Sequence, residues 1–112
     1  MSGPSFDTVI RGGTVATASD TFQADVGILG GTVAALGLDL PAGREEIDGT
    51  GRLVLPGGVD AHAHIEQLSA AGIMNSDTWE SATASAALGG TTSVISFAAQ
   101  HVGSDLAQVV SD

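Results

Sequence analysis

The sequence of 112 residues contains no cysteine and no tyrosine, and its three basic residues are all arginine. Without cysteine no disulfide can form, and a metal ion would have to be held by histidine, aspartate or glutamate side chains. The absence of disulfides is compatible with a reducing compartment, and we therefore expect a cytoplasmic protein.

Positive charge is also scarce, because three arginines stand against thirteen acidic residues and give a formal net charge of −10. An acidic surface repels phosphate groups, so we expect neither nucleic acid nor an anionic membrane as a partner. The start of the sequence lacks the basic residues and the apolar stretch of a signal peptide. No apolar run approaches the roughly eighteen residues of a membrane span, which predicts a soluble protein.

The first half of the sequence has the pattern of short β-strands separated by glycine-rich turns. Arg11-Gly12-Gly13 and Gly30-Gly31 each lie between two strand-like segments and predict two hairpins. The six predicted strands lie at residues 6–10, 14–17, 24–29, 32–37, 45–48 and 52–55. We expect them to form a meander that makes up part of a β-sandwich.

After Pro56 the pattern changes to strands alternating with helices. Asp77 or Thr78 would cap the first helix, and Gly89-Gly90 would end it. This order is typical of parallel βα units, but two units cannot close a barrel, which needs about 250 residues. The sequence therefore predicts the N-terminal part of a larger protein. The predicted elements are a strand at residues 59–65, a helix at 79–88, a strand at 91–97 and a helix from 106.

His62 and His64 stand two residues apart on the strand expected after Pro56. Residues i and i+2 of a strand project to the same face, so the two imidazoles would lie side by side. Imidazole is a good ligand for zinc, iron and nickel, and two parallel imidazoles can converge on one ion. Two ordinary histidines at a strand end are the alternative, but a position at the mouth of a βα unit favours metal ligands.

The motif from Leu55 to His64 resembles the cyclic amidohydrolases of the metal-dependent amidohydrolase superfamily, most closely the dihydropyrimidinases and hydantoinases. Segments 7–15 and 86–95 resemble the start of the family's N-terminal sandwich and the junction between its first barrel helix and second barrel strand. The resemblance implies an α/β fold, with N-terminal strands of a composite β-sandwich at residues 1–55. The first βα units of a TIM (β/α)8 barrel would follow at residues 56–112, and the barrel is incomplete in this chain.

The resemblance also implies an activity, the ring-opening hydrolysis of a small cyclic amide such as a dihydropyrimidine or a hydantoin. Two divalent ions, usually zinc, would hold a bridging hydroxide that attacks the ring carbonyl. His62 and His64 would bind the more buried ion, and a carboxylated lysine, two histidines and an aspartate from later strands would complete the site. This sequence has no lysine, so it cannot supply the bridging ligand. Since the resemblance places the other missing groups on later strands, we expect no catalytic residue within the sequence and no activity from the chain alone. By analogy with the family, the whole protein would be a homo-oligomer, a tetramer.

Further residues are candidates for roles around the metal. Asp60 shares the face of the histidines, and we expect a buried, hydrogen-bonded carboxylate one layer below the metal, with a third ligand as the alternative. The loop after the first barrel strand is long for a βα connection, and in hydantoinase-like enzymes it borders the substituent on the ring. The candidate substrate contacts in this loop and after the second barrel strand are Gln67, Leu68, Ile73, Met74 and His101. For each of them the alternative is an ordinary surface residue without contact to a substrate.

Two other functions are open at this point. Within the family, an allantoinase or a dihydroorotase is the nearest alternative. Dihydroorotases carry an arginine for the substrate carboxylate, and the loop after His64 contains none, which disfavours that activity. A non-catalytic interaction or assembly module is the second alternative. The intact histidine pair argues against it, because a scaffold has no need for paired ligands.

Overall fold

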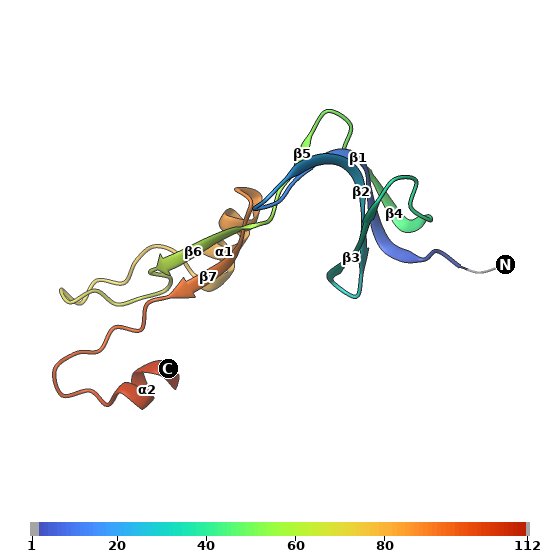
Figure 1. The fold of residues 1–112 in the computed structure, drawn as a ribbon. Coiled ribbons are helices and arrows are strands. Elements are labelled where there is room, and N and C mark those ends of the chain that lie inside the picture. Colours follow the sequence, from blue (N-terminus) through green and yellow to red (C-terminus); the bar gives the residue numbers. More distant parts are fainter. Residues whose placement is uncertain (1–2, 112) are drawn as a thin grey trace. The chain divides into compact units, whose positions relative to one another are not determined.

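The structure is a computed structural model that describes residues 3–111 of the chain. It divides into two compact units, Met1–Pro56 and Gly57–Asp112, each with a sheet of its own (Figure 1). No helix within residues 3–111 is long and apolar enough to cross a membrane.

The first unit contains one mixed sheet. The strand order is β3-β2-β1-β4, and β5 also pairs with β1. Strand β2 is antiparallel to β1, whereas β4 and β5 run parallel to it. The expected meander is therefore wrong beyond β3, because the later strands return to pair with β1. The described residues of this unit form a single sheet. The strands are β1 (Phe6–Ala16), β2 (Thr21–Leu29), β3 (Thr32–Gly37), β4 (Gly43–Asp48) and β5 (Leu53–Val54).

The predicted first hairpin is also wrong, because its turn residues Gly12 and Gly13 lie inside the long strand β1. The pairing of β1 with β2 shifts register between Ile10 and Gly13, which marks a β-bulge. Gly12 has a φ of 62°, which glycine adopts without strain. Strand β2 is long enough to pair with both halves of β1, so the chain turns later, between Thr17 and Asp20.

The second predicted hairpin is confirmed between β2 and β3. Gly30 and Gly31 have φ values of 60° and 74°. A two-residue type I′ turn requires positive φ at both central positions, and glycine meets this requirement at no steric cost. The local sequence therefore determines this turn.

The core of the first unit holds a buried carboxylate. Asp25, 8% exposed, lies between the core residues Ala24 and Val26. Its Oδ1 accepts a hydrogen bond from the backbone N of Gly12 at 2.8 Å, and its Oδ2 accepts one from Arg11 Nη1 at 3.0 Å. These bonds, the Gly12 amide first, hold the pKa of Asp25 below its ordinary value. Asp25 thereby fixes the bulge of β1 against β2.

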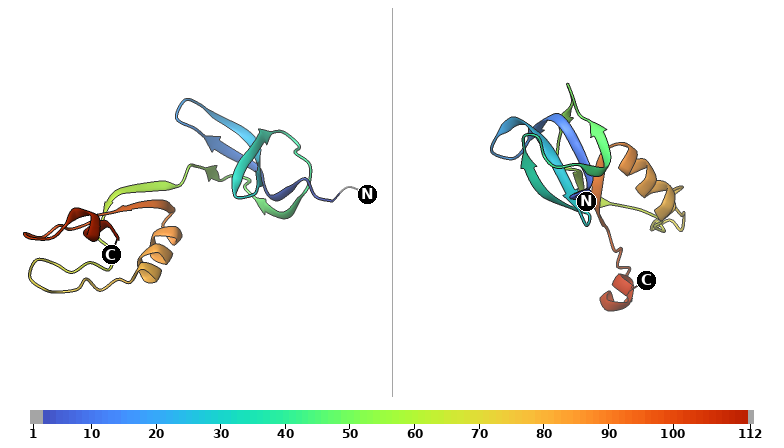
Figure 2. Two further views of the ribbon diagram at one scale, coloured as in Figure 1. Left: turned by 90° about the horizontal axis from the view of Figure 1, so that it is seen from below. Right: turned by 90° about the vertical axis from the view of Figure 1, so that its right-hand side faces the viewer.

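The second unit contains two parallel strands, β6 (Gly58–Ala63) and β7 (Thr91–Ser96). Helix α1 (Trp79–Leu88) connects them and packs against β7, and Figure 2 shows the helix beside this strand. Helix α2 (Leu106–Ser111) follows β7. The predicted order of strand, helix, strand and helix is confirmed, and within residues 57–111 the two strands do not close a barrel.

Helix α1 has its predicted bounds because local residues determine both of its ends. The side chain of Thr78 accepts a hydrogen bond from Ser81 N at 3.1 Å, and Ser81 Oγ accepts one from Thr78 N at 3.0 Å. This reciprocal pair is a capping box, with serine in the place of the usual glutamate. At the other end Gly89 is the C-cap, and Gly90, with a φ of 90°, turns the chain into β7.

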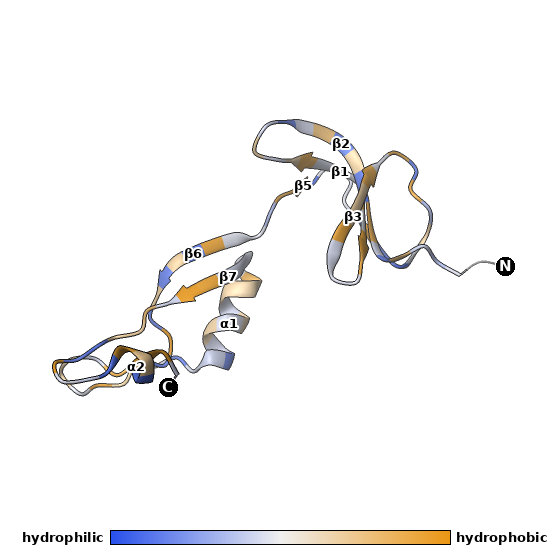
Figure 3. Ribbon diagram, turned by 60° about the horizontal axis from the view of Figure 1, so that its bottom comes forward, coloured by the Kyte–Doolittle hydropathy of each residue, from blue (hydrophilic) through white to orange (hydrophobic). Residues whose placement is uncertain are grey.

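The strands of the second unit carry exposed apolar side chains. Figure 3 shows hydrophobic residues along β7 and along part of β6. Val59 on β6 is 65% exposed and Ile95 on β7 is 60% exposed, whereas Ala63 and Ile65 are buried. The described residues therefore leave apolar surface on both strands uncovered.

Candidate metal centre

The two predicted metal ligands lie side by side at the end of β6. The Nε2 atoms of His62 and His64 are 3.1 Å apart, and the ring centroids are 5.0 Å apart. Strand alternation explains the arrangement, because Ala63 between them points to the opposite face and is buried. Both histidines are exposed to solvent.

Phe97, the first residue after β7, lies against both imidazoles. Its ring stacks on His62 with 5.1 Å between centroids and 18° between planes, and its centroid lies 5.1 Å from that of His64. Parallel strands bring their carboxyl ends to one edge, and Phe97 N donates a hydrogen bond to Ala63 O at 2.8 Å. The phenyl ring therefore restricts how the two imidazoles can turn.

The loop after β6 holds His64 from the other side. Nδ1 of His64 is hydrogen-bonded to Oε1 of Gln67, and Nε2 of Gln67 donates to Phe97 O at 3.2 Å. Nδ2 of Asn75 donates to His64 O at 2.7 Å, and Oδ1 of Asn75 accepts from Gln67 N at 2.7 Å. These bonds tie the loop to the strand end that carries the histidines.

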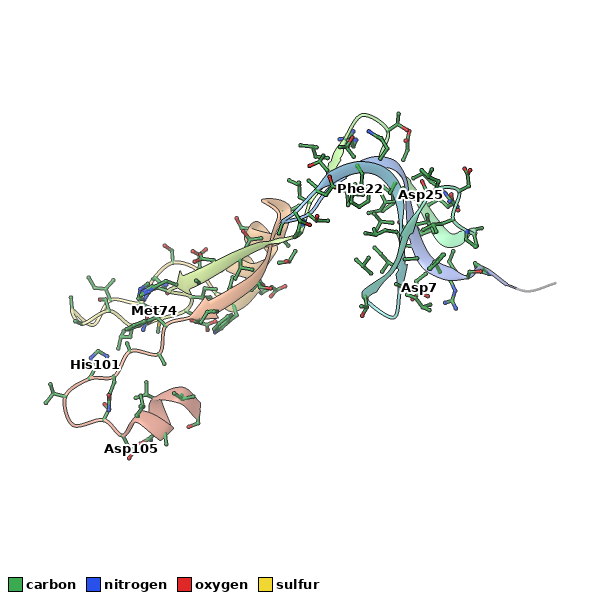
Figure 4. All side chains as sticks on the ribbon, in the orientation of Figure 1. Asp7, Phe22, Asp25, Met74, His101 and Asp105 are labelled. Atoms are coloured by element: carbon green, nitrogen blue, oxygen red, sulfur yellow. The ribbon has the colours of Figure 1, made fainter. Side chains whose placement is uncertain are left out.

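A hollow of roughly 560 Å³ lies beside His64. Figure 4 labels Met74 and His101, which come from the two chain segments that follow β6 and β7. The structure brings all five predicted substrate contacts to this hollow, and their contact with a substrate stays a prediction. They are Gln67, Leu68, Ile73, Met74 and His101.

Asp60 is hydrogen-bonded as expected but is not buried. Its Oδ1 accepts a hydrogen bond from His62 N at 3.1 Å, yet the residue is exposed, because the two-stranded sheet leaves this side of β6 open. Within residues 3–111, no three histidine, cysteine, aspartate or glutamate side chains form a group that could hold a metal ion. The described chain thus offers a pair of imidazoles and not a complete ligand set.

No protein-family model matches the chain, but individual proteins do. A D-hydantoinase of Streptomyces coelicolor is 48% identical over 105 residues, which cover 88% of this chain and 22% of that protein. The crystal structure of a dihydropyrimidinase from Brevibacillus agri matches with a TM-score of 0.85 and 46% identity, over 93% of this chain and 23% of that one. An allantoinase of Escherichia coli is 42% identical over 91 residues, which cover 81% of this chain and 19% of that protein.

The chain is homologous to the N-terminal portion of the hydantoinases and dihydropyrimidinases. It spans about a fifth of the length of the curated relatives it matches. The similarity to an allantoinase extends the homology to the N-terminal segment of cyclic amidohydrolases more broadly. The resemblance indicated by the motif from Leu55 to His64 is confirmed.

Three residues of this hydantoinase-like segment were not predicted from the sequence. Glu66 adopts a φ of 49° and accepts a hydrogen bond from Trp79 N at 2.9 Å, at the start of α1. Asn75 is hydrogen-bonded to the backbone oxygen of His64 and to the backbone N of Gln67, and Phe97 stacks on the ring of His62. For Phe97 a signal was present, because a residue at the carboxyl end of the second parallel strand lies near the end of the first. For Asn75 the only signal was an amide among apolar loop residues.

Proposed function

We propose that this chain supplies two histidine ligands to the metal site of a hydrolase that opens small cyclic amides. The proposal rests on the 3.1 Å separation between the Nε2 atoms of His62 and His64, in a chain homologous to part of the hydantoinases. Two imidazole nitrogens so close together need a proton on one of them or a cation shared by both. The arrangement therefore suits a divalent ion such as zinc.

At such a site, different residues of this chain would bind the metal ion and contact the substrate. When bound, a divalent ion lowers the pKa of water and polarises the carbonyl under attack. His62 and His64 would hold the ion, whereas the side chains around the hollow would contact the substrate. Leu68, Ile73 and Met74 make part of its wall apolar, which suits a hydrocarbon substituent on the ring.

The full proposal also covers the reaction, the cellular localisation and the oligomeric state. Hydrolysis of a C–N bond in a hydantoin or dihydropyrimidine ring would give an N-carbamoyl amino acid. The complete site would hold two zinc ions, with its other ligands from outside residues 3–111, in a cytoplasmic homotetramer. The chain alone would therefore be inactive. An allantoinase is the rival activity, supported by the allantoinase relative.

Metal titration of the 112-residue chain tests the ligand pair. We expect isothermal calorimetry to give one bound Zn²⁺ per chain and binding at least about tenfold weaker in His62→Ala and in His64→Ala. His101→Ala is the matched control, because the ring of this histidine lines the same hollow but is neither hydrogen-bonded to nor stacked on His62 or His64, and it should bind like wild type. Equal affinity in all four proteins would contradict the proposal.

A substrate panel tests the reaction, with the polypeptide as its natural source produces it. Hydantoin, dihydrouracil, allantoin and dihydroorotate are compared at equal concentration. We expect opening of the hydantoin or dihydrouracil ring, lost on treatment with a chelator and restored by zinc. Hydrolysis of allantoin alone would assign the rival activity. A protein without bound metal and without hydrolysis would instead be an assembly module.

A further inference from the structure

We infer that Gln67 is a positioning residue that fixes the tautomer of His64 and leaves the Nε2 lone pair of this imidazole free for a metal ion. The inference deepens the proposed function and rests on it for the identity of the ligand. Three observations support it. The Gln67 side-chain amide has a defined orientation, the backbone of Gln67 is hydrogen-bonded to Asn75, and the ring of His62 lacks an orienting bond like the one His64 receives.

The orientation of the Gln67 amide follows from its second partner. The backbone oxygen of Phe97 can only accept a hydrogen bond, so the group 3.2 Å away must be the NH₂ of Gln67. The amide oxygen of Gln67 then faces Nδ1 of His64. Because this oxygen can only accept, Nδ1 of His64 carries the proton. Nε2 of the neutral ring is left with its lone pair, directed toward Nε2 of His62.

Gln67 is itself held in place through the loop. Its backbone N donates to Oδ1 of Asn75 at 2.7 Å, and its backbone O accepts from Asn75 N at 3.1 Å. The NH₂ of Asn75 donates to the backbone oxygen of His64, which closes a ring of hydrogen bonds. Backbone groups thus orient both amide side chains, and Gln67 can hold His64 with little loss of freedom on metal binding.

His62 lacks such an orienting bond. Among residues 3–111 its ring is hydrogen-bonded to Nε2 of His64 alone, and Phe97 contacts it only through the faces of the two rings. With the lone pair of His64 directed at it, the His62 ring donates from Nε2 when no ion is bound. His62 must therefore change its tautomer to bind a metal ion, whereas His64 is ready to bind.

Imidazole NMR of the full 112-residue chain at about pH 8 tests the tautomers directly. In two-bond ¹H–¹⁵N spectra we expect His64 with its proton on Nδ1 and His62 with its proton on Nε2. Gln67→Met keeps the length of the side chain but removes the acceptor, so the His64 proton should move toward Nε2. Gln67→Glu keeps an acceptor oxygen and should preserve the wild-type tautomer of His64.

Zinc affinity provides the second readout. We expect binding about 10- to 100-fold weaker in Gln67→Met and within a fewfold of wild type in Gln67→Glu. Val102→Ala is the matched control, since Val102 is fully exposed in the segment after β7 and does not line the hollow beside His64, and its affinity should not change. Backbone amide spectra show whether each variant is folded. Asn75→Ala removes the side-chain bonds of Asn75 to Gln67 N and His64 O, and it should also weaken zinc binding.

The outcomes separate the two proposals. A proton on Nε2 of His64 in the wild-type chain, or no change of tautomer in folded Gln67→Met, would overturn the role of Gln67. Weak zinc binding in Gln67→Glu despite the wild-type tautomer would also overturn it. If both histidines show the expected tautomers but the chain binds no zinc, the proposed function is contradicted. The role of Gln67 in fixing the tautomer of His64 would still be supported.

Discussion

Asp25 shows how the first unit accommodates a charge inside its core. The carboxylate accepts hydrogen bonds from the backbone N of Gly12 at 2.8 Å and of Leu40 at 3.1 Å, and from the Arg11 guanidinium. Arg11 is shared with Glu46, whose carboxylate lies 2.6 Å from Nη2. A buried carboxylate without partners would be costly, so these bonds explain why it is tolerated.

The stability of the first unit should therefore depend on acid pH. The pKa of Asp25 is lowered by Gly12 and then Arg11, and that of Glu46 by Arg11 and then Gly43. A lowered pKa in the folded state stabilises the fold above the ordinary carboxylate pKa of about 4, and this contribution is lost as the pH falls through the lowered value. We expect the melting temperature, followed by circular dichroism, to fall as the pH goes from about 5 to 2.

The variant Asp25→Asn isolates the contribution of the buried carboxylate. It should melt at a lower temperature than wild type at pH 7 and lose less stability on acidification, because one of the responsible carboxylates is gone. Glu45→Gln is the matched control, because this substitution also removes one negative charge and Glu45 is an exposed residue of β4 next to Glu46. Equal acid sensitivity in Asp25→Asn and wild type would show that the Asp25 bonds do not stabilise the fold.

At the scale of elements, two glycine pairs of the first unit have different outcomes. Gly30-Gly31 makes the predicted hairpin turn, whereas Gly12-Gly13 lies in a bulge inside β1. Glycine permits both structures, and a positive φ by itself does not choose between them. The pairing of both halves of β1 with the single strand β2 decides the outcome, and this pairing is not a local property. Helix α1 was predicted with its correct bounds because its caps are local.

A close approach between Gly57 and Thr92 gives a prediction for the strand pair of the second unit. A Cβ at Gly57 would lie 1.9 Å from Thr92 Oγ1 and 2.7 Å from Thr92 Cβ. We expect Gly57→Ala to lower the free energy of unfolding by about 1–3 kcal/mol, measured by urea denaturation, because the strand end must move to relieve this overlap.

The neighbouring glycine is the matched control for this substitution. A Cβ at Gly58 would meet Thr91 Oγ1 at 3.4 Å, an ordinary contact, so Gly58→Ala should change stability by about 0.5 kcal/mol or less. Thr92→Ala in the Gly57→Ala background should restore part of the loss, since it removes the closest atoms. Equal effects of the two glycine substitutions would contradict the steric explanation.

At the scale of the whole molecule, apolar exposure on the second unit predicts self-association. Val59 and Ile95 are more than half exposed, and β6 and β7 are each an edge of a two-stranded sheet. We expect sedimentation velocity of the 112-residue chain to show a weight-average mass that rises with concentration. Ile95→Lys should reduce this rise, whereas Val102→Lys, at an exposed loop position outside the strands, should not. A monomer at every concentration would contradict the prediction.

The sequence by itself determined what depends on short-range patterns. Strand alternation brings His62 and His64 together, local caps set the ends of α1, and the motif before His64 indicated the amidohydrolase family. The tertiary structure alone decided the bulge of β1, the return of β4 and β5 to pair with β1, and the bond of Gln67 to His64. Each of these depends on which distant segment supplies the hydrogen-bonding partner, and a pattern along the chain does not specify that partner.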